Sequence, residues 1–184
     1  MLCDTLLWHG LLKPMNVQNH NPITVEVDCQ NVTHHVDLPS DKQLNQWVDA
    51  VINYPIKYAA LNSITIPVSI TIRIVDETEG ATLNATWRQR QGATNVLSFP
   101  FDYPPGIGLS ELTHYLLGDL VICAPVVERE AREQQKSLLS HWAHLVIHGT
   151  LHLLSYDHLD DHEAQLMEDL EIRILATLNY PNPY

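Results

Sequence analysis

Apolar and polar residues alternate along two stretches of the chain, residues 23–29 and 68–75, which is the pattern of half-buried β-strands. The clearer stretch is VSITIRIV at residues 68–75, where every second side chain is branched and apolar. Two further, largely apolar stretches at residues 95–101 and 116–123 also predict strands. Pro100 lies inside the third of these and favours a position at the edge or end of a sheet. We therefore expect a small sheet of about four strands.

Between and after these strands, apolar residues recur at helical spacing. Ser40 can cap a helix that Pro55 ends, and Asp160 with Glu163 fits a capping box at the start of the last helix. Residues 103–115 contain two prolines and two glycines and are predicted to form a surface loop. The fold class predicted is α+β (mixed α/β), with the sheet packed against about five helices. Helices are expected at about 41–54, 78–87, 125–134, 138–154 and 161–178.

The length of 184 residues predicts one folded domain. We expect this domain to span residues 15–184, with residues 1–14 forming a poorly ordered extension, and either Met1 or Met15 could start translation. The three cysteines are far apart and form no CxxC pair, which is typical of buried thiols in a reducing cytosol. No apolar run is long enough to span a membrane, so a cytoplasmic protein without a membrane partner is predicted.

The formal net charge is −12, with only ten lysines and arginines. This charge argues against a protein held on nucleic acid by its overall field, although it leaves room for a local basic groove. The acidic stretch from Asp160 through Glu171 is interpreted as the solvated face of the last helix.

Three histidines in the run HGTLHLLSYDH carry the strongest chemical signal. His148 and His152 are four residues apart in a predicted helix, so their rings leave the same face and could grip one metal ion. His158 comes six residues later, and the chain would have to turn at residues 154–157 to bring it back. Three imidazoles leave one tetrahedral position open, which is typical of catalytic zinc. These spacings predict a metal site on the C-terminal helices.

His144 lies one helical turn before His148. It cannot share an ion with both His148 and His152, because positions 144 and 152 are about 12 Å apart along a helix and zinc–nitrogen bonds are about 2.0–2.1 Å long. We predict that His144 instead orients a ligand or a substrate.

The histidine spacing resembles the HExxHxxGxxH motif of metzincin proteases, with two departures. Gly149 stands where those proteases carry the glutamate that serves as general base, which disfavours peptide hydrolysis. Ser155 stands at the position of the turn glycine, where a left-handed backbone costs a residue with a side chain about 1–2 kcal/mol. Gly149 would let another backbone or a substrate approach the helix closely.

Three segments together resemble the YbeY family, the bacterial metal-dependent endoribonucleases of ribosomal RNA maturation. HGTLHLLSYDH matches the family signature HGxLHLxGYDH except at Ser155. Residues 83–88 (LNATWR) and 94–100 (TNVLSFP) match a second signature, with Trp87 in its aromatic place. The strand LGDLVIC at residues 117–123 matches as well. The order and spacing agree from about residue 70 to the end of the chain.

The resemblance implies that His148, His152 and His158 hold one zinc ion and that Arg88 is the active-site arginine. It also implies an endoribonuclease specific for single-stranded RNA, acting in maturation of the 3′ end of 16S ribosomal RNA and in ribosome quality control. Ribosomal RNA and proteins of the small subunit would then be its partners. Three histidines would also suit Ni²⁺ or another divalent ion, and no organic cofactor is expected.

The chemistry of RNA cleavage fits the remaining candidate residues. A planar guanidinium such as Arg88 can bind two oxygens of a phosphorus centre that gains charge. Arg90 and Arg73 could add phosphate contacts, with Arg73 on the polar face of its strand forming one wall of a groove. Ser98 could contact the substrate or a metal ligand. No residue is placed by sequence as a general base, so either water or the RNA 2′-hydroxyl could attack, and the product ends would decide.

Two alternatives to a nuclease remain open at this point. One is a non-catalytic ribosome assembly factor, in which zinc holds the last two helices together. The other is a zinc hydrolase or peptidase, which Gly149 disfavours.

Overall fold

The computed structural model describes residues 22–184 except 56, 57, 59, 60, 62 and 157–159. The predicted N-terminal extension, Met15 and His158 lie outside the described residues. The elements follow one another in the order β1 (Val25–Asn31), α1 (Asp41–Ile52), β2 (Val68–Val75), α2 (Glu77–Arg88), β3 (Val96–Pro100), a 3₁₀ turn (Leu109–Glu111), β4 (Tyr115–Cys123), α3 (Ala124–Glu133), α4 (Leu138–Leu153) and α5 (Asp161–Thr177).

The predicted elements are confirmed, with ends that differ by one or two residues, and the fold is α+β. Ser40 caps α1 with a capping box, and the Asp160 side chain accepts hydrogen bonds from the first backbone N–H groups of α5. The 3₁₀ turn inside the predicted loop is the one addition to the expected elements in the described part of the chain.

The four strands form one mixed sheet in the order β1-β2-β4-β3. β1, β2 and β4 run parallel, and β3 pairs with β4 in the antiparallel direction. β3 is therefore an edge strand, and Pro100 is its last residue, as predicted.

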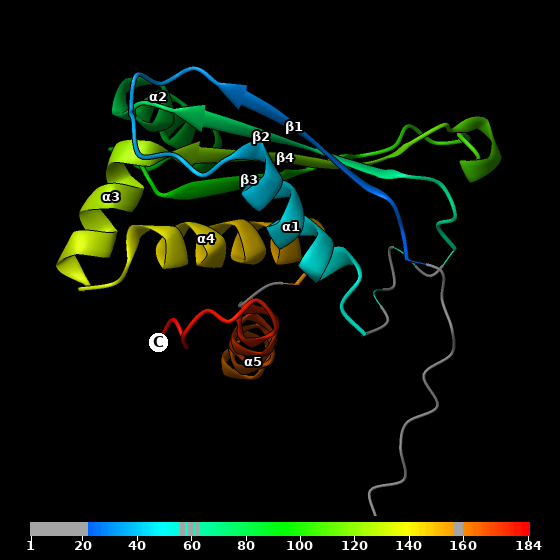
Figure 1. Cartoon of the computed structure of the whole chain (residues 1–184). Coiled ribbons are helices and arrows are strands. Elements are labelled where there is room, and N and C mark those ends of the chain that lie inside the picture. The colour runs from blue at the N-terminus through cyan, green and yellow to red at the C-terminus, as the bar shows by residue number, and fades with distance from the viewer. Residues whose placement is uncertain (1–21, 56–57, 59–60, 62, 157–159) are drawn as a thin grey trace, which may run out of the picture.

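Helices cover both faces of the sheet (Figure 1). α1 and α4 lie on one face and α2 lies on the other, while α5 packs against α4 on the side away from the sheet. α4 is thus enclosed between the sheet and α5, and its long apolar sequence follows from burial on both sides. No helix in the described part of the chain is both long and apolar enough to cross a membrane.

The main core lies between the sheet and the α1/α4 layer. The apolar side chains of β2 point into it, and the large side chains of Trp47 and Trp142 fill it from α1 and α4. The alternate residues of β2 point to the α2 face, and Arg73 is among them. Arg73 forms an ion pair with Glu79, with Nε 2.7 Å from Oε1. The prediction that Arg73 lies on the polar face of its strand is confirmed, and this face is the one that α2 covers, opposite α4.

Candidate metal centre

One side of α4 carries four histidines, at positions 141, 144, 148 and 152. Their ring centroids follow one another at 6.3, 6.1 and 4.6 Å. Because α4 is enclosed by other elements, each ring needs a partner for its polar atoms. α3 and α5 supply a partner for one ring nitrogen each of His141, His144 and His148. His152 faces His148, and the Nδ1 atoms of His141 and His144 are buried without a hydrogen-bond partner among the described residues.

His148 and His152 face each other at the C-terminal half of α4. Their Nε2 atoms are 3.1 Å apart. Two nitrogens bound to one tetrahedral zinc at about 2.0–2.1 Å would be about 3.3 Å apart, so the observed separation fits a shared ion. The predicted convergence of these two rings is confirmed, while the position of His158 relative to them lies outside the described residues.

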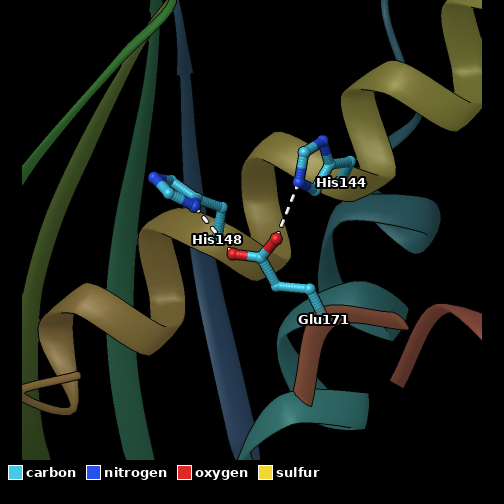
Figure 2. A group of neighbouring side chains, drawn as sticks. All are labelled: His144, His148 and Glu171. Atoms are coloured by element: carbon cyan, nitrogen blue, oxygen red, sulfur yellow. Dashed lines mark hydrogen bonds and ion pairs between the residues drawn. The ribbon is translucent and has the colours of Figure 1, made fainter. Parts of the chain in front are cut away.

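Glu171 of α5 holds His144 and His148 from the other side (Figure 2). Its Oε1 lies 2.7 Å from His148 Nδ1, and its Oε2 lies 2.8 Å from His144 Nε2. The Tyr184 hydroxyl also donates to Oε2. Glu171 is completely buried, so the interpretation of the acidic stretch as a solvated helix face is wrong at this residue. A buried carboxylate of this kind fixes the direction of the histidines that donate to it.

The charge of Glu171 is maintained by its histidine partners. Burial by itself raises the pKa of this carboxyl group, but hydrogen bonds from His144 and His148 outweigh burial and lower the pKa to about 2. Because the carboxylate accepts the Nδ1 proton of His148, the Nε2 atom of a neutral His148 keeps its lone pair. That lone pair lies on the side of His152.

His144, His148 and Glu171 themselves form a possible metal site, since one ligand atom of each lies within 4.8 Å of the others. His148 therefore belongs to two groupings, one with His152 and one with Glu171 and His144. The second grouping is already joined by two short hydrogen bonds.

Sequence analysis missed Glu171, although the pattern of α5 contains a signal for it. The buried apolar residues of α5 recur at helical spacing, at positions 167, 170, 174 and 175. Glu171 lies inside this stripe, where an acidic residue has to find a buried partner.

His141 and Glu130 were also missed, and they form a second pair, in which His141 is buried and Glu130 is half-buried. His141 is 3% exposed, and its Nε2 lies 2.9 Å from Glu130 Oε2. The Asn95 side-chain amide donates to the same carboxylate. Burial raises the pKa of Glu130, but the hydrogen bonds from His141 and Asn95 outweigh it and keep the pKa below its ordinary value.

A pocket of about 490 Å³ lies beside these pairs, on the Glu171 side of His148. Its lining includes three carboxylates, Glu130, Glu168 and Glu171, and one lysine, Lys136. This charge balance does not suit a phosphate group.

Gly149 allows α4 to lie directly on the sheet, so the close approach predicted at this glycine is made by the sheet. A Cβ atom at this position would lie 2.8 Å from Leu120 Cδ2 and 3.3 Å from Ser98 Oγ. Ser98 donates a hydrogen bond of 3.2 Å to the carbonyl oxygen of Gly149. β3 and the histidine helix are thereby joined next to His148. Ser155, directly after α4, adopts the predicted left-handed backbone with φ of 67°.

The two arginines of the predicted site lie apart from the histidines. Arg88 ends α2 and Arg90 follows it, and both side chains are exposed. α2 lies on the sheet face opposite α4, so the sheet separates the two helices (Figure 1). Within the described residues, no ion pair or hydrogen bond joins either guanidinium to the histidines.

The chain is similar to known proteins over most of its length. The sequence model of the family described as endoribonuclease YbeY matches residues 28–179. An endoribonuclease YbeY from Pseudomonas fluorescens is 52% identical over 160 residues, which cover 87% of this chain and 96% of that relative. A solution structure of a Thermotoga maritima protein is similar over 84% of this chain and 92% of its own, with 19% identity and a TM-score of 0.46, which is too weak to support a conclusion. The family match and the high identity over most of the chain establish that this protein belongs to the endoribonuclease YbeY family.

Proposed function

We propose that this protein is a metal-dependent endoribonuclease that cuts single-stranded RNA during maturation of the 3′ end of 16S ribosomal RNA and in ribosome quality control. Membership of the endoribonuclease YbeY family supports the activity and the RNA substrate. The observation that carries the metal dependence is the 3.1 Å separation of His148 Nε2 and His152 Nε2 beside a buried carboxylate.

We assign the ion to the side of His148 that faces His152. This position leaves both hydrogen bonds of Glu171 intact, whereas an ion between His144, His148 and Glu171 would replace them. The family resemblance supplies His158 as third ligand. We assign Zn²⁺, with Ni²⁺ or another divalent ion as the alternative that the same donors would accept.

An ion in this position would act as a Lewis acid toward a phosphoryl oxygen and would make water more acidic. Arg88 is assigned to the non-bridging phosphate oxygens, because its guanidinium is permanently charged and can bind two oxygens together. Ser98 is a β3 residue whose side chain faces α4, and it would contact the substrate near His148. Glu171 would keep His148 in the tautomer that presents Nε2.

We further propose that the protein works in the cytoplasm with ribosomal RNA and small-subunit proteins as partners. The free thiols of Cys29 and Cys123 are consistent with a reducing compartment. A net charge of −12 gives weak intrinsic affinity for RNA, so a ribosomal partner would help to bring the enzyme to its substrate.

The test is metal analysis together with cleavage of structured ribosomal RNA by wild type, His152→Ala, Arg88→Glu and a control, His162→Ala. His162 is an exposed histidine on α5. We expect His152→Ala to lose metal and cleavage together. Arg88→Glu should keep the metal but cut about 100- to 1000-fold more slowly. His162→Ala should behave as wild type.

Undiminished cleavage in both His152→Ala and Arg88→Glu would refute the assignment of the activity to this site. Metal binding without any cleavage by wild type would instead favour a zinc-stabilised assembly factor. The ends of the product identify the attacking group, because a 2′,3′-cyclic phosphate reports attack by the RNA 2′-hydroxyl and a 5′-phosphate reports attack by water.

A further inference from the structure

Aromatic side chains follow the edge strand β3, and two of them, Trp87 and Phe99, contact each other on the face opposite the histidines. Trp87, in the last turn of α2, is 65% exposed, and its ring lies 5.7 Å from that of Phe99 on β3. Phe101, directly after β3, is 45% exposed and contacts Tyr103 at 4.8 Å. Trp87, Phe99 and Phe101 are called the β3 aromatic track below. Phe99 itself is half-buried, so Trp87 and Phe101 carry the exposed aromatic surface of the track.

Two arginines at the end of α2 have no carboxylate partner among the described residues. In the described part of the chain, Arg73, Arg129, Arg132 and Arg173 each pair with a glutamate or aspartate. Arg88 and Arg90 do not form such a pair there, although the chain carries more than twice as many acidic as basic residues. Arg88 directly follows Trp87 in the chain and Arg90 comes two residues later, so the end of α2 is locally positive in an acidic protein.

The backbone that carries these arginines is fixed by buried contacts. Asn84 of α2 is 4% exposed, and its side-chain amide donates a 2.8 Å hydrogen bond to the carbonyl oxygen of Gly92. Gln89 and Gly92 both have positive φ, which folds the segment back toward the start of β3. Arg88 and Arg90 are thus presented from an ordered turn, which lowers the entropy lost on binding a ligand.

β3 connects the β3 aromatic track with the candidate metal centre. Ser98 points to α4 and bonds to Gly149, while its neighbour Phe99 points to the opposite face and contacts Trp87. Because β3 is the edge of the sheet, a chain lying across it could reach both faces. Asp119 of β4 lies opposite Phe99 in the strand register. Because its carboxylate repels phosphates, the phosphates of a bound RNA should lie nearer to the arginines than to β4.

We infer that the β3 aromatic track binds single-stranded RNA, with bases stacking on Trp87 and Phe101 and phosphates contacting Arg88 and Arg90. This inference rests on the proposed function, since it places the RNA next to the bond to be cut. Unpaired bases present faces that stack on aromatic rings, and a duplex hides those faces. Guanidinium groups without carboxylate partners favour a polyanion as the ligand, and the endoribonuclease family of this chain makes RNA the polyanion that we choose.

The test measures binding of a fluorescent eight-nucleotide single-stranded RNA by anisotropy, with all proteins carrying His152→Ala so that the probe stays intact. Trp87→Ala is compared with Trp87→Phe and with Leu166→Ala, a control residue on α5 that is 49% exposed. Loss of one stacking ring should weaken binding roughly 5- to 150-fold. Trp87→Phe should retain most of the affinity, and Leu166→Ala should retain all of it. Arg90→Ala should lower the slope of log affinity against log salt by about 0.7.

Equal affinities for Trp87→Ala and Leu166→Ala, or an unchanged salt slope for Arg90→Ala, would overturn the inference. Equal binding of duplex and single-stranded RNA would also overturn it. If Trp87→Ala kept RNA binding but lost binding to small-subunit proteins, the surface would be a protein docking site. RNA cleavage is measured separately with the protein that keeps His152. If this protein bound single-stranded RNA at the track but did not cut it, the proposed function would be refuted and the inference about the track would stand.

Discussion

Replacing Glu171 by glutamine tests the support of the candidate metal centre. Glutamine has the size of glutamate but only one side-chain oxygen. In the native protein, two histidine N–H groups donate to two different oxygens of Glu171, at 2.7 and 2.8 Å. The amide nitrogen of Glu171→Gln would face one of these N–H groups, either that of His144 or that of His148. Because Glu171 is completely buried, water cannot replace the lost hydrogen bond.

The size of the effect follows from these contacts. A hydrogen bond to a charged group contributes about 1.5–3 kcal/mol, so we expect the free energy of unfolding of the metal-free protein to fall by about 2 kcal/mol. Loss of an orienting partner lowers metal affinity by about 10- to 100-fold. Urea denaturation in the presence of a chelator measures the first quantity, and competition with a chromophoric chelator for Zn²⁺ measures the second. Glu168→Gln, a partly exposed residue on the same helix, serves as the matched control.

Two results would contradict this reasoning. If Glu171→Gln and Glu168→Gln had the same zinc affinity, Glu171 would not orient a ligand. If Glu171→Gln also unfolded at the same urea concentration as wild type, the buried hydrogen bonds would contribute nothing to stability. Lower stability with unchanged zinc affinity would limit the role of Glu171 to joining α4 and α5.

Three further predictions concern the packing around the site. Gly149→Ala should lower the free energy of unfolding by about 1–2 kcal/mol in urea titrations, because its Cβ would lie 2.8 Å from Leu120 Cδ2 in a packed core; equal stability would show that Leu120 can move aside. Ser155→Gly should raise the free energy of unfolding by up to about 1 kcal/mol in the same assay, since φ at this position is 67°. Asn95→Ala should destabilise the protein by about 1 kcal/mol at pH 7, and the difference from wild type should shrink as the pH falls below 4.5. The reason is that a carboxyl group with a lowered pKa, as at Glu130, stabilises the fold above its ordinary value of 4.5 and loses this effect as the pH falls through its folded pKa; a constant difference across this pH range would contradict the prediction.

The fold could be predicted from local pattern because each element buries one face. The alternation of β2 and the helical spacing of α4 place apolar residues on the side that packs, and both elements lie where the pattern puts them. The order of the strands could not be predicted, since alternation says which face of a strand is buried but not which strand lies beside it. Arg73 is an example. The sequence predicted that Arg73 lies on the polar face of β2, but it could not predict that α2 covers this face and supplies Glu79 as the partner of Arg73.

The candidate site was predictable to the extent that it lies within one helix. A spacing of four residues brings His148 and His152 together regardless of the rest of the fold, and their Nε2 atoms lie 3.1 Å apart. Glu171 is 23 residues from His148, and only the packing of α5 on α4 brings the two together. The position of Arg88 relative to the histidines depends on the tertiary fold in the same way, because Arg88 lies on α2 and the histidines lie on α4.

The burial of α4 explains why the histidines require acidic partners from other helices. α4 is enclosed between the sheet and α5, so an unpaired imidazole N–H on it would lose its hydrogen bond to water. Glu130 from α3 and Glu171 from α5 each accept such a hydrogen bond, and each of these carboxylates stays charged because a histidine donates to it. The packing of α5 on α4 therefore has two effects: it stabilises the fold, and it fixes the direction of the His148 ring through Glu171. For this reason a substitution that loosens α5 should weaken metal binding even when every histidine of α4 is present.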